Sequence, residues 1–285
     1  MHLYGILIAL SLALAAFLCT REERRLGLPR DTGLDIVLYA LPPAIVAARL
    51  YYVAFTWEYF SAHPERIIRV WEGGLAIYGA VIGGAAGLFF LAKKRGLPFL
   101  QLADLVAPSL LLGQAIGRWG NFFNGEAFGY AVENPAFQFF PFAVQVQGGW
   151  HLATFFYESL WNALGFLFLY LNRVRFEKGR QGHVFFWYLV WYGLGRLLIE
   201  GLRTDSLMLG GVRVSQLLSL ILVCAALVKL LIDHRLRRGW LALPLIAPAA
   251  AFLLPGWAGI LAAWACLAAA AIRLYPACGG RNAAA

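Results

Sequence analysis

Apolar residues occur in long uninterrupted runs, separated by short segments in which arginine, lysine, glycine and polar residues collect. A run of about twenty apolar residues is long enough to cross the hydrocarbon core of a bilayer as a helix. Seven runs are predicted as membrane-spanning helices: residues 3–19, 34–55, 74–92, 102–120, 154–171, 184–201 and 214–232. A further stretch, residues 240–272, is interrupted by Pro255-Gly256 and is predicted either as two short spans or as a re-entrant hairpin.

These runs predict an all-α fold, a polytopic transmembrane helix bundle of about seven core spans followed by the C-terminal apolar hairpin or extra spans. The connection 121–153 is aromatic, glycine-containing and nearly uncharged, and it is predicted to form a small outward-facing head. We expect residues 1–235 to form one integral-membrane domain and residues 236–285 to be an apolar extension to which the sequence assigns no role. No internal repeat is evident, so the inverted-repeat architecture common in transporters has no support.

The amino-acid composition excludes the soluble classes of protein. Hydrophobic residues make up 61% of the 285 residues and charged residues 14%, with a mean hydropathy of +0.68. Soluble domains are closer to half apolar and a quarter charged, and disordered or collagen-like chains are still more polar. The four cysteines lie in or beside apolar runs without CxxC or metal-ligand spacing, and we interpret them as packing residues. No metal ion and no diffusible cofactor is expected.

The net charge of +9 follows a topological pattern. The connections after the first, third, fifth and seventh runs hold 14 of the 24 basic residues: Arg21, Arg24, Arg25, Arg30, Lys93, Lys94, Arg95, Arg173, Arg175, Lys178, Arg180, Arg235, Arg237 and Arg238. By the positive-inside rule these connections are cytoplasmic and the N-terminus faces outward. The first run carries its charges after the apolar stretch, which is typical of such a span and not of a cleaved leader. The basic excess therefore predicts orientation, and we expect no nucleic-acid partner.

Six charged residues fall within or at the ends of the predicted spans: Arg49, Asp104, Arg118, Glu158, Arg196 and Glu200. A charge near the bilayer centre costs about 2.5–3.5 kcal/mol on insertion scales, so each needs a partner or a function. Asp104 and Glu158 fit two interpretations equally, a functional role or a simple pairing with an arginine that fixes helix packing.

The sixth span carries a row of polar side chains. Tyr192, Arg196, Glu200 and Arg203 follow one another at intervals of four, four and three residues, which places them on one helix face. An ion-pair ladder that joins two helices would explain Arg196 and Glu200. However, two arginines face one carboxylate, and this spacing predicts a positive surplus that an anionic ligand would neutralise.

The fourth span ends in a second cluster, residues 117–129, which reads GRWGNFFNGEAFG. Arg118 and Asn121 share a helix face, and the four glycines allow the backbone to approach a ligand or another helix closely. Packing alone does not require an arginine beside Asn121, Asn124 and Glu126. A guanidinium fork among amide donors suits a phosphate, so the residues predict an outer-leaflet site for a phosphate-bearing lipid.

Tyr78 lies in a third glycine-rich stretch, residues 71–84, whose glycines predict close helix contacts. Its hydroxyl needs a partner inside the bundle. Taken alone, such a tyrosine is more often a packing residue than a catalyst, and both interpretations remain.

The run 117–129 resembles the signature of the prolipoprotein diacylglyceryl transferases. Supporting similarities follow in order over about residues 1–235: residues 2–5, 48–52, 73–84, 151–158, 192–203 and 215–216. The resemblance implies a bacterial inner-membrane enzyme with its active site toward the outer leaflet. Such an enzyme transfers the sn-1,2-diacylglyceryl group of phosphatidylglycerol to the lipobox cysteine of a preprolipoprotein signal peptide and releases glycerol phosphate.

The resemblance also implies roles for individual residues. Arg118 and Arg196 would hold the phosphate, and Glu200 and Arg203 would orient Arg196 or gate the access of substrate. The catalytic candidates are Arg118, Arg196, Tyr78 and Glu126, and the substrate-binding candidates are Arg118, Asn121, Asn124, Gly129, Tyr4, Tyr192, Glu200 and Arg203.

Tyr78 stands where some family members carry a histidine proposed as the base. A tyrosine with an ordinary pKa of about 10 is a poor base at neutral pH. Three possibilities therefore stay open: a lowered pKa of Tyr78, proton transfer to Glu126 or Glu200, or ionisation of the thiol without a dedicated base. Two other functions also stay open. A transporter or flippase of anionic phospholipid would explain the buried arginines, and a structural subunit would use them only to join helices.

Overall fold

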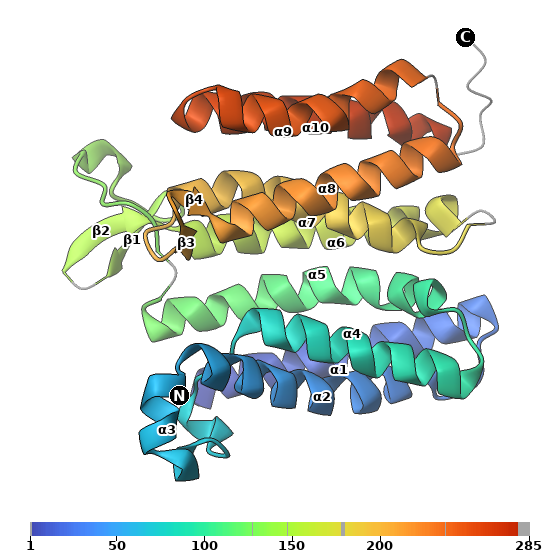
Figure 1. Cartoon of the computed structure of the whole chain (residues 1–285), viewed down its shortest axis with the longest axis horizontal. Helices are drawn as coiled ribbons and strands as arrows, with labels where there is room; N and C mark the ends of the chain where they lie inside the picture. Colours follow the sequence, from blue (N-terminus) through green and yellow to red (C-terminus); the bar gives the residue numbers. More distant parts are fainter. Residues whose placement is uncertain (1, 127, 147, 178–179, 237, 279–285) are drawn as a thin grey trace. The chain divides into compact units, whose positions relative to one another are not determined.

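The computed structural model describes residues 2–126, 128–146, 148–177, 180–236 and 238–278 (Figure 1). It divides into two compact units, a larger one of Met1–Ser11 and Ala107–Ala285, and a smaller one of Leu12–Val106. The boundaries between the units fall within two helices, α1 (His2–Leu26) and α5 (Phe99–Asn124).

The described chain is predominantly helical, which confirms the predicted all-α bundle. The other α-helices are α2 (Thr32–Phe55), α3 (Trp57–Ala62), α4 (Ile77–Arg95), α6 (Thr154–Glu177), α7 (His183–Leu202), α8 (Val214–Asp233), α9 (Ala242–Leu253) and α10 (Gly256–Ala277). Short 3-10 turns cover Pro64–Arg66, Val70–Glu72, Pro135–Phe137 and Arg238–Leu241. Within the described ranges, six helices are long and apolar enough to cross a membrane, namely α1, α2, α4, α5, α8 and α10.

All seven predicted spans correspond to helices, but several helices continue beyond the apolar run. The helix α1 extends to Leu26, α5 to Asn124 and α6 to Glu177. Basic side chains at a helix C-terminus interact favourably with the helix dipole, as Arg24 and Arg25 do in the last turn of α1. The helices α6 and α7 have the length of a span, although tryptophan, tyrosine and charged residues lower their hydropathy.

The C-terminal stretch forms a helical hairpin with unequal arms. Its first helix, α9, has 12 residues and rises about 18 Å, which is too short to cross the hydrocarbon core. Its second helix, α10, has 22 residues and is long enough. The arm α10 is thus longer than the short spans of the first predicted arrangement, and the stretch as a whole forms a helical hairpin. The break occurs at Pro255, as predicted, because proline precedes the helix and Gly256 adopts a left-handed φ of 53°.

In the smaller unit, glycines allow α2 and α4 to pack closely. Gly79, Gly83 and Gly87 repeat every four residues along one face of α4. A Cβ atom at any of them would come within 2.1–2.3 Å of a backbone oxygen of α2. The predicted close helix contact is present, and it depends on residues that lack a side chain.

In the larger unit, α7 packs against α6, α8 and α10. Figure 1 shows α9 and α10 alongside α7 and α8. Trp161 of α6 and Trp191 of α7 each donate the indole N–H to the backbone oxygen of the other, both at 2.9 Å. The indoles lie against Gly195 and Gly165, where a Cβ atom would overlap the rings. This reciprocal pairing fixes the register of the two helices.

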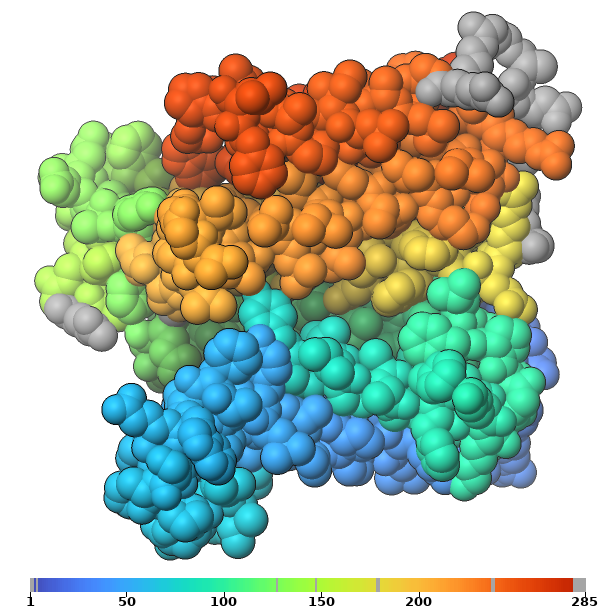
Figure 2. All heavy atoms as spheres, in the orientation of Figure 1, coloured from blue at the N-terminus to red at the C-terminus, as the bar shows by residue number. Residues whose placement is uncertain are grey.

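Among the described residues there are two small antiparallel hairpins, one in the predicted head and one in the connection from α7 to α8. Strand β1 (Ala143–Val146) pairs with β2 (Gly149–Leu152), and β3 (Met208–Leu209) pairs with β4 (Val212–Arg213). The first hairpin belongs to the segment between α5 and α6, whose green atoms lie at the left edge of the larger unit in Figure 2. The second connects α7 to α8. Both hairpins therefore lie at the end of the larger unit where α7 ends.

Candidate functional site

A buried carboxylate joins two arginines from different helices of the larger unit. Glu158 of α6 is only 3% exposed. Its Oε1 accepts a hydrogen bond from Nη2 of Arg118 on α5 at 2.5 Å, and its Oε2 accepts one from Nη1 of Arg196 on α7 at 2.9 Å. The structure thus brings Arg118 and Arg196 together, as predicted, with Glu158 between them.

Two further carboxylates complete the cluster. The second amine of Arg196, Nη2, lies 2.6 Å from Oε2 of Glu200, which is 1% exposed. Nη1 of Arg203 lies 4.0 Å from Oε2 of Glu158, while its Nε and Nη2 bind the two oxygens of Asp205 at 2.9 and 2.7 Å. Burial acts to raise the pKa of Asp205, but the hydrogen bonds and charge of Arg203 outweigh it and hold the pKa below its ordinary value.

The balance of charge differs from what the spacing on α7 predicts. That spacing gives two arginines against one carboxylate, but Glu158 comes from another helix and Asp205 from the following loop. The three arginines therefore meet three carboxylates: Arg118, Arg196 and Arg203 with Glu158, Glu200 and Asp205. The predicted surplus within this group is wrong, because the sequence pattern of a single helix does not include partners from its neighbours.

A fourth arginine beside the cluster restores an excess of positive charge. Nη1 of Arg213 donates to the backbone oxygens of Glu200 and Arg203 and to Oγ of Ser206, and Nη2 donates to Oη of Tyr130 at 2.9 Å. All four acceptors are uncharged oxygens. Within the described ranges, no carboxylate pairs with Arg213.

Neighbouring contacts fix the helices that present these side chains. The indole N–H of Trp119, next to Arg118, donates to Oγ of Ser159, next to Glu158, at 3.1 Å. Ser159 in turn donates to the backbone oxygen of Ala115 at 2.8 Å. Because these bonds join α5 to α6 one residue from the ion pair, they hold Arg118 opposite its carboxylate.

Gly129 attaches the head to the end of α7. It forms an isolated β-bridge with Arg203, and its N–H donates to the backbone oxygen of Leu152 at 2.9 Å. A Cβ atom at Gly129 would lie 2.7 Å from the Cβ of Leu152 and 2.8 Å from the backbone oxygen of Leu202. Only glycine fits at this junction without a shift of its neighbours. The predicted residue is therefore placed beside Arg203.

The remaining residues from the 117–129 run surround the end of α5. Asn121 is half-buried one turn after Arg118, and its backbone oxygen accepts a hydrogen bond from the N–H of Glu126 at 2.9 Å. The side chains of Asn124 and Glu126 are exposed at the helix end. The structure does not bring Asn124 and Glu126 into the arginine–carboxylate cluster.

The three candidate tyrosines have different surroundings. Tyr192 lies one turn before Arg196 on α7, and its ring stacks on that of Tyr188 with centroids 5.9 Å apart. Tyr78 is the second residue of α4 in the smaller unit, and its ring centroid lies 6.3 Å from that of Tyr51. Tyr4 lies in α1, and its side chain is outside the described part of the structure.

Sequence reasoning did not include Glu158, Arg213 or Tyr130 among the candidate site residues. Glu158 had a signal, because a carboxylate inside a membrane span needs a cationic partner. Arg213 had only the weak signal of a basic residue at the start of an apolar helix. Among the described residues, no group of three or more His, Cys, Asp and Glu side chains is arranged to hold a metal ion.

The cluster has the chemistry of an oxyanion site. A carboxylate buried this deeply is costly unless it is paired, and here it aligns two guanidinium groups. Each guanidinium is a planar fork that binds carboxylates and phosphates in the same way. Arginines held at this spacing can exchange a carboxylate oxygen for a phosphate oxygen.

Comparisons with known proteins agree with this chemistry. A family model described as prolipoprotein diacylglyceryl transferase matches residues 1–232. The chain is 45% identical over 245 residues to the phosphatidylglycerol–prolipoprotein diacylglyceryl transferase of Limosilactobacillus reuteri (strain DSM 20016), an alignment that covers 84% of this chain and 89% of that one. It is 46% identical over 240 residues to the proteins of the same name from Bacillus cereus (strain G9842) and Bacillus anthracis, with 82% and 88% covered.

Proposed function

Because the chain belongs to the prolipoprotein diacylglyceryl transferase family, we propose that it transfers the sn-1,2-diacylglyceryl group of phosphatidylglycerol to a preprolipoprotein. The acceptor is the thiol of the lipobox cysteine, and the second product is glycerol phosphate. This reaction is the first step of bacterial lipoprotein maturation.

The observation that carries this proposal is the convergence of Arg118 and Arg196, from separate helices, on one buried carboxylate. The two guanidinium groups are already oriented before any ligand binds, so little reorganisation is needed when a lipid phosphate takes one or more of their donors. In the proposed complex, Glu158 keeps the arginines aligned and Glu200 holds Arg196 from the other side.

The chemistry uses the arginines at the leaving group. The thiolate sulfur attacks the glyceryl carbon that bears the phosphate ester, the C–S bond forms, and the C–O bond breaks. The bonding electron pair passes to the ester oxygen, so glycerol phosphate leaves as a phosphate monoester with an additional negative charge. Arg118 and Arg196 stabilise that developing charge. The thiol proton leaves before or during the attack, and the three routes for its removal stay open.

The proposed site lies toward the outer leaflet of the bacterial inner membrane, with the N-terminus outside. In the larger unit the arginine cluster lies at the end of α7, whereas Arg173 and Arg175 near the end of α6, and Arg180 after that helix, precede the start of α7. By the positive-inside rule, this distribution supports a cytoplasmic location for the basic end. The lipobox segment of the substrate would then meet the cluster on the outer side.

A direct assay tests the reaction. Purified protein in lipid nanodiscs is incubated with phosphatidylglycerol, labelled on the headgroup glycerol and on an acyl chain, and with a lipobox peptide. We expect the diacylglyceryl peptide and glycerol phosphate in equal amounts, and neither product with a peptide whose cysteine is replaced by serine. A transporter would move labelled lipid without cleaving it. Absence of both products, with the protein folded, contradicts the proposal.

A further inference from the structure

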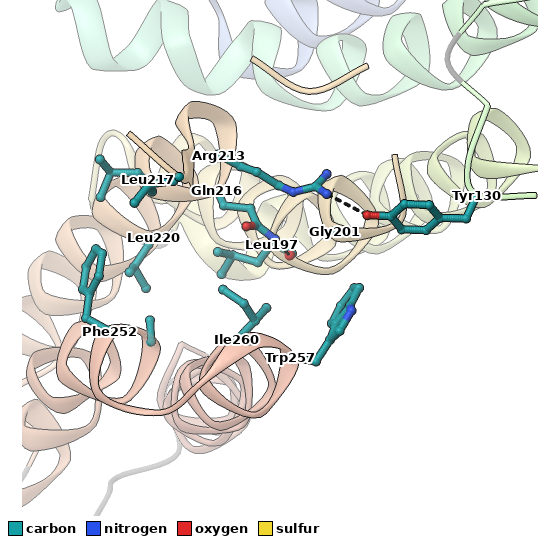
Figure 3. A pocket seen from close by; sticks show the side chains of 14 residues that line it. Tyr130, Leu197, Gly201, Arg213, Gln216, Leu217, Leu220, Phe252, Trp257 and Ile260 are labelled. Carbon is teal, nitrogen blue, oxygen red and sulfur yellow. Dashed lines mark hydrogen bonds between the residues drawn. The ribbon is translucent and has the colours of Figure 1, made fainter. Parts of the chain in front are cut away.

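A cavity of about 310 Å³ lies between α7, α8 and the C-terminal hairpin of α9 and α10 (Figure 3). This volume is at the lower end of the range for small-molecule sites, about 300–1,000 Å³. Its wall is mostly apolar, with Leu197, Leu220, Phe252 and Ile260 among the lining side chains. Figure 3 shows the polar groups of the wall collected at one side, where Arg213 and Tyr130 lie.

The C-terminal hairpin makes one wall of this cavity. Phe252 of α9 and Trp257 and Ile260 of α10 line it, whereas the family model ends at residue 232. The ring of Trp257 covers Gly201, where a Cβ atom would lie only 2.3 Å from the ring. The indole N–H of Trp264 donates to the backbone oxygen of Leu194 at 3.1 Å. Two tryptophans thus fix the hairpin to α7. The cavity between the hairpin and α7 is therefore held open by specific contacts of this chain.

The polar side of the cavity favours an anion. Arg213 is half-buried and, within the described residues, binds only uncharged oxygens. It directly precedes α8, so the positive end of that helix dipole adds to its charge. Tyr130 adds a hydroxyl beside the guanidinium, and the Gln216 amide is held by the backbone oxygen of Leu197 at 2.9 Å. One uncompensated cation at the edge of an apolar cavity is complementary to an amphiphile with one anionic group.

We propose that this cavity binds an anionic glycerophospholipid, with an acyl chain along the apolar wall and its phosphate at Arg213. Phospholipid is the amphiphile that surrounds a membrane-spanning helix bundle. The guanidinium suits a phosphate oxygen, and the volume accommodates part of one chain. Neither Arg118 nor Arg196 is among the residues that line this cavity, although Arg213 also contacts the backbone of Glu200 and Arg203 in the neighbouring cluster. The proposed lipid site does not depend on the proposed function.

Photolabelling tests this proposal without any peptide acceptor, so no turnover is involved. The protein in nanodiscs is exposed to phosphatidylglycerol or phosphatidylcholine carrying the same diazirine-modified acyl chain, and labelled residues are identified by mass spectrometry. We expect labelling within residues 252–260 to be at least fivefold stronger with phosphatidylglycerol. Arg213→Gln should remove this preference, and Ile260→Trp should reduce the labelling at least fivefold by filling the cavity.

Matched variants make the result specific. Leu261→Trp adds the same ring to an exposed neighbour that does not line the cavity, and Arg273→Gln removes an exposed charge from the same helix, so both should keep the preference. Arg196→Lys should also keep it. Equal labelling by the two lipids would identify ordinary boundary lipid and overturn the proposal. Loss of labelling in Arg196→Lys would place the lipid at the other site, which also overturns it. If Arg213→Gln does not fold, Ile260→Trp against Leu261→Trp decides the question.

Discussion

Arg49 in the smaller unit and Arg196 in the larger unit bind different kinds of oxygen acceptor. Arg49 on α2 is 6% exposed, and its guanidinium donates to the backbone oxygens of residues 66, 67, 73 and 74 at 2.5–3.1 Å. The centroid of the Phe60 ring also lies 5.0 Å from its Cζ. Arg196 on α7 instead contacts the side-chain carboxylates of Glu158 and Glu200.

The difference lies in what a ligand could replace. Backbone oxygens are fixed by the chain, so the donors of Arg49 cannot turn to a ligand without unfolding the connection between α2 and α4. Carboxylates lie on side chains that can rotate, and they share with phosphate the geometry that a guanidinium recognises. We infer that Arg49 holds the connection in place and that the cluster around Glu158 is the one suited to binding.

The largest effect is expected from Arg196→Lys. Lysine keeps the positive charge but cannot bind two oxyanions with a fixed fork, so stabilisation of the leaving phosphate should be lost. We expect kcat/KM in the peptide assay to fall roughly 10²–10³-fold, the cost of removing one donor to a developing charge. The thermal unfolding temperature of the protein in detergent should change little, because the charge that Glu158 and Glu200 need remains.

The control for this change is Arg273→Lys, which alters an exposed arginine of α10 and should leave kcat/KM within twofold. If Arg196→Lys also kept wild-type kcat/KM, the fork of Arg196 would not bind the substrate. The different acceptors of Arg49 and Arg196 would then not indicate which of the two arginines binds substrate.

Arg49→Met should act on stability. It leaves four backbone oxygens in the connection between α2 and α4 without their donor, and each unsatisfied buried acceptor costs about 1–3 kcal/mol. Because water can reach part of this connection, we expect the free energy of unfolding to fall by about 3–5 kcal/mol in total. Denaturant titration in detergent micelles measures this change.

Arg69→Met is the matched control, since Arg69 lies in the same connection with 42% of its side chain exposed and pairs with Glu72 at the surface. Such a pair is worth about 0–1 kcal/mol, so the control should be nearly neutral. Equal destabilisation by the two variants would contradict the structural role given to Arg49.

Sequence alone predicted the helices and part of the site. The four-residue interval on α7 correctly placed Arg196 and Glu200 on one face, and the glycine repeat on α4 correctly indicated a close contact, because both are properties of a single helix. The prediction that Arg203 shares this helix face is wrong, because α7 ends at Leu202 and Arg203 has an extended backbone. The pairing of Glu158 with Arg118 and Arg196 was not predictable, since it depends on how three helices pack. For the same reason, the sequence placed Arg49 and Arg196 in one group, whereas the structure separates them by their acceptors.

Gly129→Ala should have the smallest of these effects, and it tests whether the cluster depends on the head. The added Cβ would come within 2.8 Å of the backbone oxygen of Leu202 and 2.9 Å of the side chain of Thr154. To relieve this steric overlap, the β-bridge between residue 129 and Arg203 must shift. Misplacement of a positioning group costs up to about 10²-fold in rate. We expect kcat/KM to fall about tenfold, because only Arg203, at the edge of the cluster, is displaced.

Gly149→Ala provides the comparison for that last change. Gly149 is in the same segment, in β2, but a Cβ atom there would meet only the ring of His151, at 3.4 Å, which can move slightly. Its kcat/KM should stay within twofold of wild type. If both alanine variants were fully active, Gly129 would not position the end of α7, and the arginine cluster would be supported by its own helices alone. If both variants lost activity equally, activity would depend on the whole segment between α5 and α6. It would then not depend specifically on the junction between Gly129 and Arg203.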